Sequence, residues 1–291
     1  MKRTMQAVCL RVITIACCCL AECFADTIYV ANFPSGHNPV RYVEKFDSNG
    51  NGSLFTNDVD ASLVADMAGN LYLGIGSSIV KYDIHGNSAM FATGLSGTTG
   101  LATDGNGNLY AAGSEIVKID SMGNTTFFAT NVPGFAHPDA LACDSSGNLY
   151  AASFLYNTIY RFDPTGNRTV FTTSISGPSG MAFDKNGYLY VSSFSSNTIA
   201  RFDPNGNMSI FASGVSLPQE LAFDGAGNLY VATLAFNTVQ KFDPIGNQST
   251  FASSGLDFPE YIAVQIPEPA TWLLVLASIS IFLFVKGLSA F

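Results

Sequence analysis

The chain has 291 residues, of which 47% are hydrophobic and 12% charged, and its formal net charge is −9 at pH 7. This composition excludes a disordered chain and supports a large buried core. Residues 26–265 carry nine Lys or Arg against twenty Asp or Glu. Such an acidic balance argues against nucleic acid and anionic membrane surfaces as partners.

The first 25 residues are typical of a secretory signal peptide. Lys2 and Arg3 supply positive charge, residues 12–20 form a short apolar run, and the segment ends in Cys23-Phe24-Ala25. We therefore expect cleavage after Ala25. A lipoprotein signal that uses Cys23 is the less favoured alternative. Removal of this segment leaves Cys143 as the one cysteine of the mature chain, which is expected to be a packing residue and excludes an intrachain disulfide.

Internal repetition dominates the rest of the chain. Three successive units read "LACDSSGNLYAASFLYNTIYRFDPTGNRTVFTTSISGPSG", "MAFDKNGYLYVSSFSSNTIARFDPNGNMSIFASGVSLPQE" and "LAFDGAGNLYVATLAFNTVQKFDPIGNQSTFASSGLDFPEY". One tyrosine recurs at intervals of 43, 38, 40, 40 and 40 residues, at Tyr29, Tyr72, Tyr110, Tyr150, Tyr190 and Tyr230. The repeat therefore defines six units.

Each unit contains four short strand candidates separated by D-x-x-G-N and D-P-x-G-N turns. Four strands in about forty residues, repeated radially, predict an all-β fold, a six-bladed β-propeller over residues 26–265. The N-terminal "TIYVAN" lacks a first strand, and "YIAVQ" at 261–265 is a first strand without a blade. Pairing the two ends would complete one blade and close the ring.

The pattern "GNLYVA…NTIxRFDPxGN" resembles the repeat of NHL-type and streptogramin-lyase-like propellers, and the resemblance covers 26–265. It implies the propeller fold. It also offers two kinds of enzyme as alternatives to a binding module, because streptogramin lyases use a histidine base and gluconolactonase-type propellers hold a divalent metal in the channel.

The acids that recur in every unit are expected to hold the turns. Six others, together with His137, are expected in the connections that lead into the innermost strands, at the channel mouth: Asp58, Asp60, Asp139, Glu220, Asp257 and Glu260. His137 is the candidate catalytic base, and Asp139, Glu220 and Glu260 are candidate ligands for Ca²⁺ or Mg²⁺. A hydrated acidic rim without a ligand is the favoured alternative, so no cofactor is expected.

The loops between second and third strands are short in two units and long in the others. The longer loops carry aromatic residues at Phe154, Tyr156, Phe194 and Phe236. Aromatic side chains on such a rim favour contacts with a sugar or a peptide. Packing between neighbouring blades explains them equally well.

The C-terminal segment 266–291 contains an apolar run of 16 residues at 270–285, followed by Lys286. As a helix this run spans about 24 Å, somewhat short for a hydrocarbon layer of about 30 Å. The combination of Pro267, Glu268 and Pro269 with a terminal apolar helix resembles the PEP-CTERM sorting signal, which implies an exosortase-type processing enzyme. That family usually ends in several basic residues, whereas this chain ends in "GLSAF". A plain membrane anchor is the alternative.

The sequence therefore predicts an exported, non-catalytic propeller that acts as a binding, surface or extracellular-matrix module. The C-terminal helix would hold it in the inner membrane, or processing would release it to the cell surface or matrix. Exopolysaccharide and other proteins are the candidate partners. The alternative is a lactonase-like or streptogramin-lyase-like enzyme with a metal or acid–base site at the channel mouth.

Overall fold

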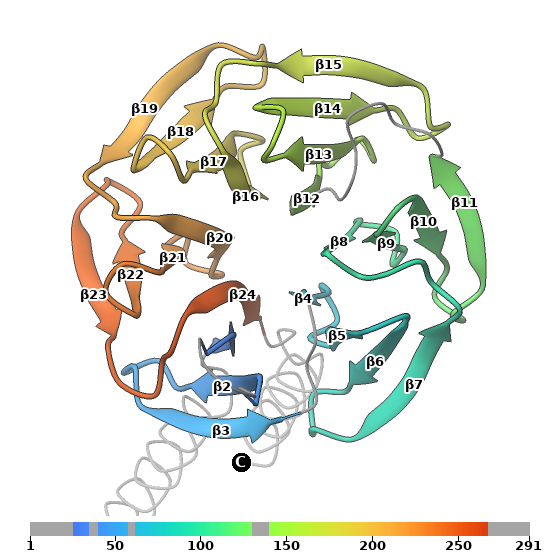
Figure 1. The fold of residues 1–291 in the computed structure, drawn as a ribbon, viewed down its shortest axis with the longest axis horizontal. Coiled ribbons are helices and arrows are strands. Elements are labelled where there is room, and N and C mark those ends of the chain that lie inside the picture. Colours follow the sequence, from blue (N-terminus) through green and yellow to red (C-terminus); the bar gives the residue numbers. More distant parts are fainter. Residues whose placement is uncertain (1–25, 35–39, 58–61, 130–139, 267–291) are drawn as a thin grey trace, which may run out of the picture. The chain divides into compact units, whose positions relative to one another are not determined.

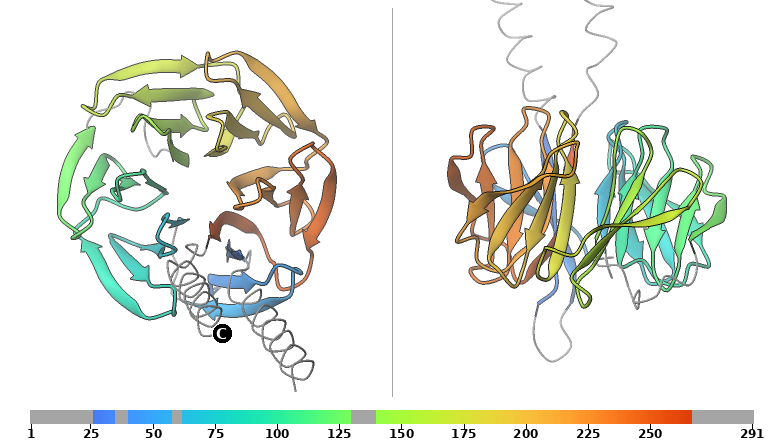
Figure 2. Two further views of the ribbon diagram at one scale, coloured as in Figure 1. Left: turned by 180° about the vertical axis from the view of Figure 1, so that it is seen from behind. Right: turned by 90° about the horizontal axis from the view of Figure 1, so that it is seen from above.

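The computed structural model describes residues 26–34, 40–57, 62–129 and 140–266. In these ranges the chain forms six four-stranded antiparallel sheets, arranged as blades around a central axis (Figure 1). Figure 2 shows the same ring from behind and edge-on. The predicted six-bladed β-propeller is confirmed. The described ranges contain no helix that could cross a membrane, and the predicted signal peptide and the segment 267–291 lie outside them.

Each blade has an inner strand at the axis, two middle strands and an outer strand. The inner strands are β4 (Leu63–Ala65), β8 (Gly100–Thr103), β12 (Ala140–Cys143), β16 (Pro178–Phe183), β20 (Pro218–Phe223) and β24 (Pro259–Gln265). The second strands are β1 (Thr27–Asn32), β5 (Leu71–Ile75), β9 (Leu109–Ala112), β13 (Leu149–Ser153), β17 (Leu189–Ser193) and β21 (Leu229–Thr233).

The third strands are β2 (Tyr42–Phe46), β6 (Ser78–Tyr82), β10 (Ile116–Ile119), β14 (Thr158–Phe162), β18 (Thr198–Phe202) and β22 (Thr238–Phe242). The outer strands are β3 (Gly52–Thr56), β7 (Ser88–Thr93), β11 (Thr125–Ala129), β15 (Arg168–Thr172), β19 (Met208–Ser213) and β23 (Gln248–Ala252). The second strands are almost wholly buried because neighbouring blades cover both of their faces.

The two ends of the propeller meet in one blade, as the repeat phase predicts. β24 pairs antiparallel with β1, so that Val264 lies opposite Ile28 and Ala263 opposite Tyr29. This pairing completes the sheet β24-β1-β2-β3 from both ends of the chain. Main-chain hydrogen bonds between the two ends of the propeller therefore close the ring.

The recurring aspartates hold the turns. In the turn after β14, Asp163 Oδ1 accepts the N–H groups of Thr165 at 2.9 Å and Asn167 at 3.0 Å, and Oδ2 accepts the Asn167 amide at 2.8 Å. The bond to the N–H four residues on recurs at Asp47, Asp66, Asp83, Asp104, Asp120, Asp144, Asp163, Asp184, Asp203, Asp224 and Asp243. At Asp163, the hydrogen bonds from Thr165 and Asn167 favour the ionised form and lower the pKa.

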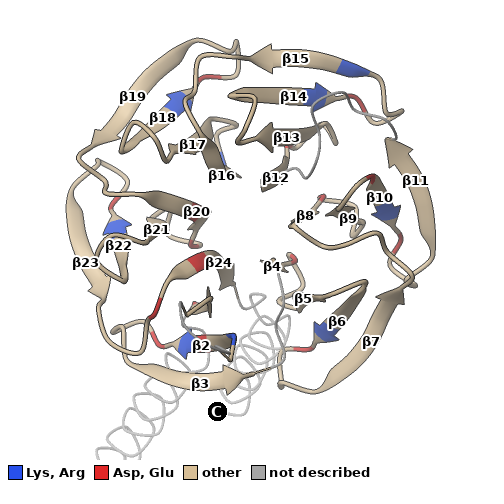
Figure 3. Ribbon diagram, in the orientation of Figure 1, with Lys and Arg blue, Asp and Glu red and all other residues tan. Residues whose placement is uncertain are grey.

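Aromatic rings link one blade to the next. The recurring tyrosine of each second strand contacts a phenylalanine of the outer strand, as Tyr190 does with Phe211 at a centroid distance of 5.0 Å. Phe211 then packs 5.7 Å from Phe242 in the next blade. The recurring bases colour every third strand in Figure 3. Several of them lie over the same tyrosines, such as Lys241 over Tyr230 at 5.1 Å. These bases are therefore part of the blade packing.

Candidate functional site

Two cavities lie on the axis of the propeller. The smaller, of about 250 Å³, is at the end where the inner strands begin, and we call it the mouth pocket. Its lining residues are Phe154, Ser179, Phe194, Gln219, Glu260 and Tyr261. The larger, of about 610 Å³, is the channel cavity, which runs along the inner strands to the turns that follow them. Tyr261 lines both cavities and so stands at their junction.

The mouth pocket is built from one position of the repeat. Ala182, Ala222 and Ala263 lie opposite the recurring tyrosines of their blades, which fixes the alignment of the three inner strands. Three residues before each alanine stand Ser179, Gln219 and Glu260. Neighbouring blades thus present an amide and a carboxyl group to one pocket, beside Ser179, whose hydroxyl donates to the carbonyl of Pro218 at 2.8 Å. The repeat alignment is the sequence signal that identifies Ser179 and Gln219, which had not been predicted.

The predicted aromatic residues divide into two pairs. Phe154 and Phe194 line the mouth pocket and form an edge-to-face pair, with centroids 5.5 Å apart and an interplanar angle of 67°. Tyr156 and Phe236 are 57% and 73% exposed and do not line it. The reason is their place in the loop, because Phe236 aligns with Tyr156, and Leu234 aligns with Phe154 and Phe194.

Three asparagines hold these loops in place. Asn157, Asn197 and Asn237 adopt φ values of 52°, 55° and 51°, a conformation that asparagine tolerates better than most residues. Their side-chain oxygens accept the N–H groups of Gly177, Leu217 and Phe258 at 2.7, 2.8 and 3.0 Å. Each bond ties the loop between second and third strands to the connection that enters the next blade. The loop aromatics are therefore held in fixed positions.

Glu260 supplies the carboxyl group of the mouth pocket. The side chain is half-buried, and burial raises its pKa while the charge of Arg41 opposes that rise. Arg41 lies over the ring of Phe33 at 4.8 Å, and Phe33 lies 5.7 Å from the ring of Tyr261. Tyr261 in turn donates its hydroxyl to the carbonyl of Thr99 at 3.0 Å.

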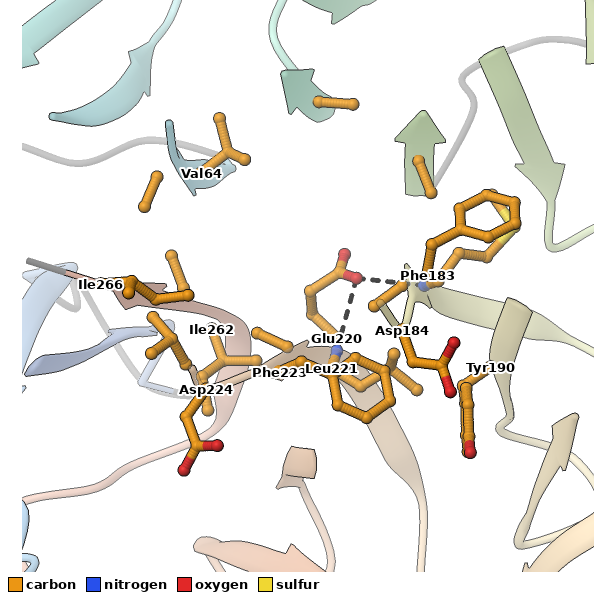
Figure 4. A pocket seen from close by; sticks show the side chains of 18 of the residues that line it. Val64, Phe183, Asp184, Tyr190, Glu220, Leu221, Phe223, Asp224, Ile262 and Ile266 are labelled. Carbon is orange, nitrogen blue, oxygen red and sulfur yellow. Dashed lines mark hydrogen bonds between the residues drawn. The ribbon is translucent and has the colours of Figure 1, made fainter. Parts of the chain in front are cut away.

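Glu220 directly follows Gln219 in β20 and lines the channel cavity (Figure 4). Its Oε1 accepts the N–H of Met181 on the neighbouring inner strand at 3.1 Å and that of Leu221 at 3.4 Å. No described residue forms a hydrogen bond with Oε2. Burial raises the pKa of Glu220 to about 8 against the opposing effect of the two N–H groups, so that the carboxyl group is largely protonated at pH 7.

Gly180 allows the close approach that places Glu220. A Cβ at Gly180 would lie 2.5 Å from the carbonyl oxygen of Gln219 and 2.6 Å from Cα of Glu220. Inner strands converge on the axis, so the neighbouring strand takes the space of the missing side chain. Gly180, Glu220 and Tyr261 occupy the same position in three consecutive blades. This position therefore varies from glycine to a carboxyl to an aromatic side chain.

Glu220 and Glu260 were expected in connections, but both belong to inner strands. β20 begins at Pro218 and β24 at Pro259, because the pairing continues past an irregularity in the register before Leu221 and near Pro259. The two carboxyl groups line different cavities. His137, Asp139, Asp58 and Asp60 lie outside the described residues.

The described ranges contain no group of three or more His, Cys, Asp or Glu side chains that could hold a metal ion. Glu220 and Glu260 are therefore not members of such a group among the described residues. Cys143 is half-buried, and burial raises the pKa of its thiol. A thiol in that state is a poor nucleophile, in agreement with a packing role.

Comparison of the fold with solved structures gives matches of low sequence identity. A chain of a nidogen/laminin complex has a TM-score of 0.70 at 18% identity, with 82% of this chain and 98% of that chain covered. Virginiamycin B lyase from Staphylococcus aureus has a TM-score of 0.58 at 16% identity, with 77% and 85% covered. A streptogramin B lyase has a TM-score of 0.60 at 15% identity, with 82% and 91% covered.

No family model and no curated protein sequence matches the chain. The structural matches share the propeller with this chain, and they include a protein that takes part in a binding complex as well as lyases. At these identities the likeness shows the fold, which this chain has in common with streptogramin-lyase-like propellers.

Proposed function

We propose that this chain is an exported, non-catalytic binding module whose mouth pocket holds one unit of a neutral oligosaccharide. The observation that carries the proposal is the Phe154–Phe194 pair beside Ser179, Gln219 and Glu260 in one pocket. Aromatic rings pack against the C–H faces of a sugar, and a few polar groups select its hydroxyls. The loops that Asn157 and Asn197 anchor favour high affinity, because loops that are already ordered lose little conformational entropy when the ligand binds.

The polar groups in the mouth pocket suit a ligand with neutral hydroxyl groups better than a charged ligand. Glu260 is the one carboxyl group among the lining residues, and burial already raises its pKa. A sugar hydroxyl can donate to the ionised carboxylate, and it can both donate to and accept from the protonated carboxyl group, so it can bond to Glu260 in either protonation state. Gln219 offers an amide with the same double capacity. An exopolysaccharide chain that threads past the mouth would present such units repeatedly.

Delivery of the module is proposed from the sequence alone. The N-terminal segment would direct export with cleavage after Ala25, and the segment with Pro267, Glu268 and Pro269 would be read by an exosortase-type enzyme. The mature chain from the native cell should then lack residues 1–25 and the apolar run at 270–285 in an intact-mass measurement. A mature chain that keeps residues 270–291 would reduce the tail to a membrane anchor.

A glycan array tests the binding site. The purified full-length chain should bind a subset of neutral oligosaccharides, and Phe154→Ala should remove that binding. Tyr156→Ala is the matched control, because this aromatic residue lies two positions along the same loop and is 57% exposed outside the pocket. Equal loss of binding in both variants, or no binding to any neutral glycan, would contradict the proposal.

An enzyme is the second candidate, and two observations favour it. The fold is shared with lyases, and Glu220 is a carboxyl group that is largely protonated at pH 7, as a general acid must be. A catalytic pocket would turn over a cyclic ester such as a lactone or a streptogramin B. Turnover that disappears in Glu220→Gln would establish this candidate and replace the binding module.

A further inference from the structure

The channel cavity is a second candidate site, distinct from the mouth pocket. Its volume of about 610 Å³ lies in the range of small-molecule sites. The walls along the inner strands are apolar and include Leu101, Ala142, Ala222 and Ile262. Such a wall favours a ligand with a short hydrocarbon part, since each buried CH₂ group contributes about 0.8 kcal/mol.

Glu220 is the acidic side chain that this apolar wall surrounds. The ring of inner strands encloses the carboxyl group, and the channel surface leaves the side chain only partly exposed. Oε1 is fixed by the N–H groups of Met181 and Leu221, which orients the group. Oε2 has no partner among the described residues, and in Figure 4 the carboxyl group points into the cavity. Because Oε2 faces the cavity, its acceptor positions are open to a ligand or to water.

The far end of the cavity is acidic. Asp66, Asp184 and Asp224 line it there, with Lys185 as the base among the lining residues. These aspartates accept hydrogen bonds within their turns, as Asp224 does from Asn228 and Tyr230. They remain charged groups at the cavity entrance, so they attract cations and repel anions over several ångströms.

We propose that the channel cavity binds a small primary ammonium ion with an apolar tail. The ammonium group enters past the acidic turns and bonds to Oε2 of Glu220, and the tail lies against the apolar inner strands. An ammonium ion supplies the hydrogen bonds that Oε2 lacks, and the ion pair is strong where water is scarce. A carboxylic acid ligand is disfavoured by the same acidic entrance.

Binding is coupled to proton release. Glu220 carries a proton at pH 7 because burial raises its pKa to about 8, whereas an alkylammonium ion stays charged up to about pH 10. The ion pair requires the carboxylate, so each bound ammonium ion displaces a proton from Glu220 to the solvent. Affinity should therefore rise roughly tenfold or more between pH 6 and pH 8 and then level off.

Isothermal titration of the full-length chain with n-hexylamine tests the site, with 1-hexanol and hexanoate as probes of equal length. Hexylamine should bind at one site per chain, and the two other probes should bind at least tenfold more weakly. Glu220→Gln keeps the acceptor for Met181 N–H and should weaken hexylamine at least tenfold. Glu115→Gln is the matched control because Glu115 lines neither cavity, and it should change the affinity less than twofold.

Titrations of the unmodified chain in two buffers of different ionisation enthalpy add a test that needs no variant. At pH 6.5 they should report release of close to one proton per bound amine, and the affinity should show the rise with pH. Equal binding of hexylamine and 1-hexanol, unchanged affinity in Glu220→Gln, or binding without proton release would each overturn the proposal. Binding of hexylamine in Phe154→Ala as in the unmodified chain would separate this site from the mouth pocket.

Discussion

Glu220 lies within the inner strand β20 and Asp224 directly follows that strand, yet the chain uses the two acids in opposite ways. Asp224 accepts the N–H of Asn228 at 2.7 Å, its side-chain amide at 2.6 Å and the hydroxyl of Tyr230 at 3.2 Å. Glu220 has one oxygen with no partner among the described residues. The aspartate recurs in five blades and the glutamate occurs once. The recurring aspartate holds the blade together, whereas the glutamate departs from the repeat and leaves a carboxyl oxygen facing the channel cavity.

The largest expected effect concerns the glycine that makes room for Glu220. Gly180→Ala should lower the free energy of unfolding by roughly 3 kcal/mol, near the upper end of the cost of overpacking. The new Cβ would meet main-chain atoms of Gln219 and Glu220, which cannot rotate away. Gly105→Ala is the matched control, because a Cβ there meets nothing within 4 Å. Denaturant unfolding measures both, and similar stabilities would contradict the close approach of the strands.

Removal of the turn acid should cost nearly as much. Asp224→Ala leaves the N–H of Asn228 and the Tyr230 hydroxyl without their acceptor, and we expect a loss of about 2 kcal/mol. Asp224→Asn, which keeps one side-chain oxygen, should recover part of that loss. Thermal unfolding distinguishes the variants. If Asp224→Ala were as stable as the unmodified chain, the structural role of the recurring acids would be wrong.

Glu220 should act on stability in the opposite sense. Its folded-state pKa of about 8 lies above the ordinary value of 4.5, so the folded chain holds a proton that the unfolded chain releases between these pH values. Its contribution to stability therefore falls as the pH rises from about 4.5 to about 8. Glu220→Gln cannot lose a proton. The variant should match the unmodified chain near pH 5 and exceed it by roughly 1–3 kcal/mol near pH 9, where partial exposure moderates the effect.

Unfolding curves of the two chains at pH 5, 7 and 9 measure this difference. A stability difference that stays constant over the range would show that Glu220 titrates in the folded chain as it does in the unfolded chain.

A smaller effect is expected at the loop anchors. Asn197→Ala places alanine at a φ of 55° and removes the bond to the Leu217 N–H, for a loss of about 1 kcal/mol. Asn197→Gly keeps the backbone conformation and loses the bond alone, so its deficit should be smaller. Hydrogen exchange of the Leu217 N–H should accelerate in both variants. Unchanged exchange would mean that this bond does not hold the loop.

Most of the fold could be predicted from the sequence because it is repetitive. The recurring tyrosines fix six units, and the missing first strand of "TIYVAN" with the surplus "YIAVQ" predicts the pairing of β24 with β1. Less of the candidate site could be predicted from the sequence. A departure from the repeat marks a position of interest, but it does not show the direction in which the side chain points. Phe236 aligns with Tyr156 and not with Phe194, but only the loop conformation shows which of these two loop positions faces the pocket.

Glu220 shows the same limit. Its position in the repeat, where no other unit has an acid, can be read from the sequence. Its hydrogen bond from the Met181 N–H, however, depends on how closely β16 and β20 approach each other. That approach depends on Gly180, forty residues earlier in the chain. The residue pattern of one repeat unit does not reveal such contacts with the neighbouring blade.

The inward aromatic pair of the mouth pocket, Phe154 and Phe194, is expected to bind the ligand of this propeller. Titration of one neutral oligosaccharide selected on the array against Phe194→Ala and Phe236→Ala tests it most directly, since both variants remove a phenylalanine from a corresponding loop. The affinity should fall about tenfold in Phe194→Ala, as expected for loss of one stacked ring of about 1.4 kcal/mol, and change less than twofold in Phe236→Ala. An equal loss in both variants, or a larger one in Phe236→Ala, would show that the mouth pocket is not the binding site.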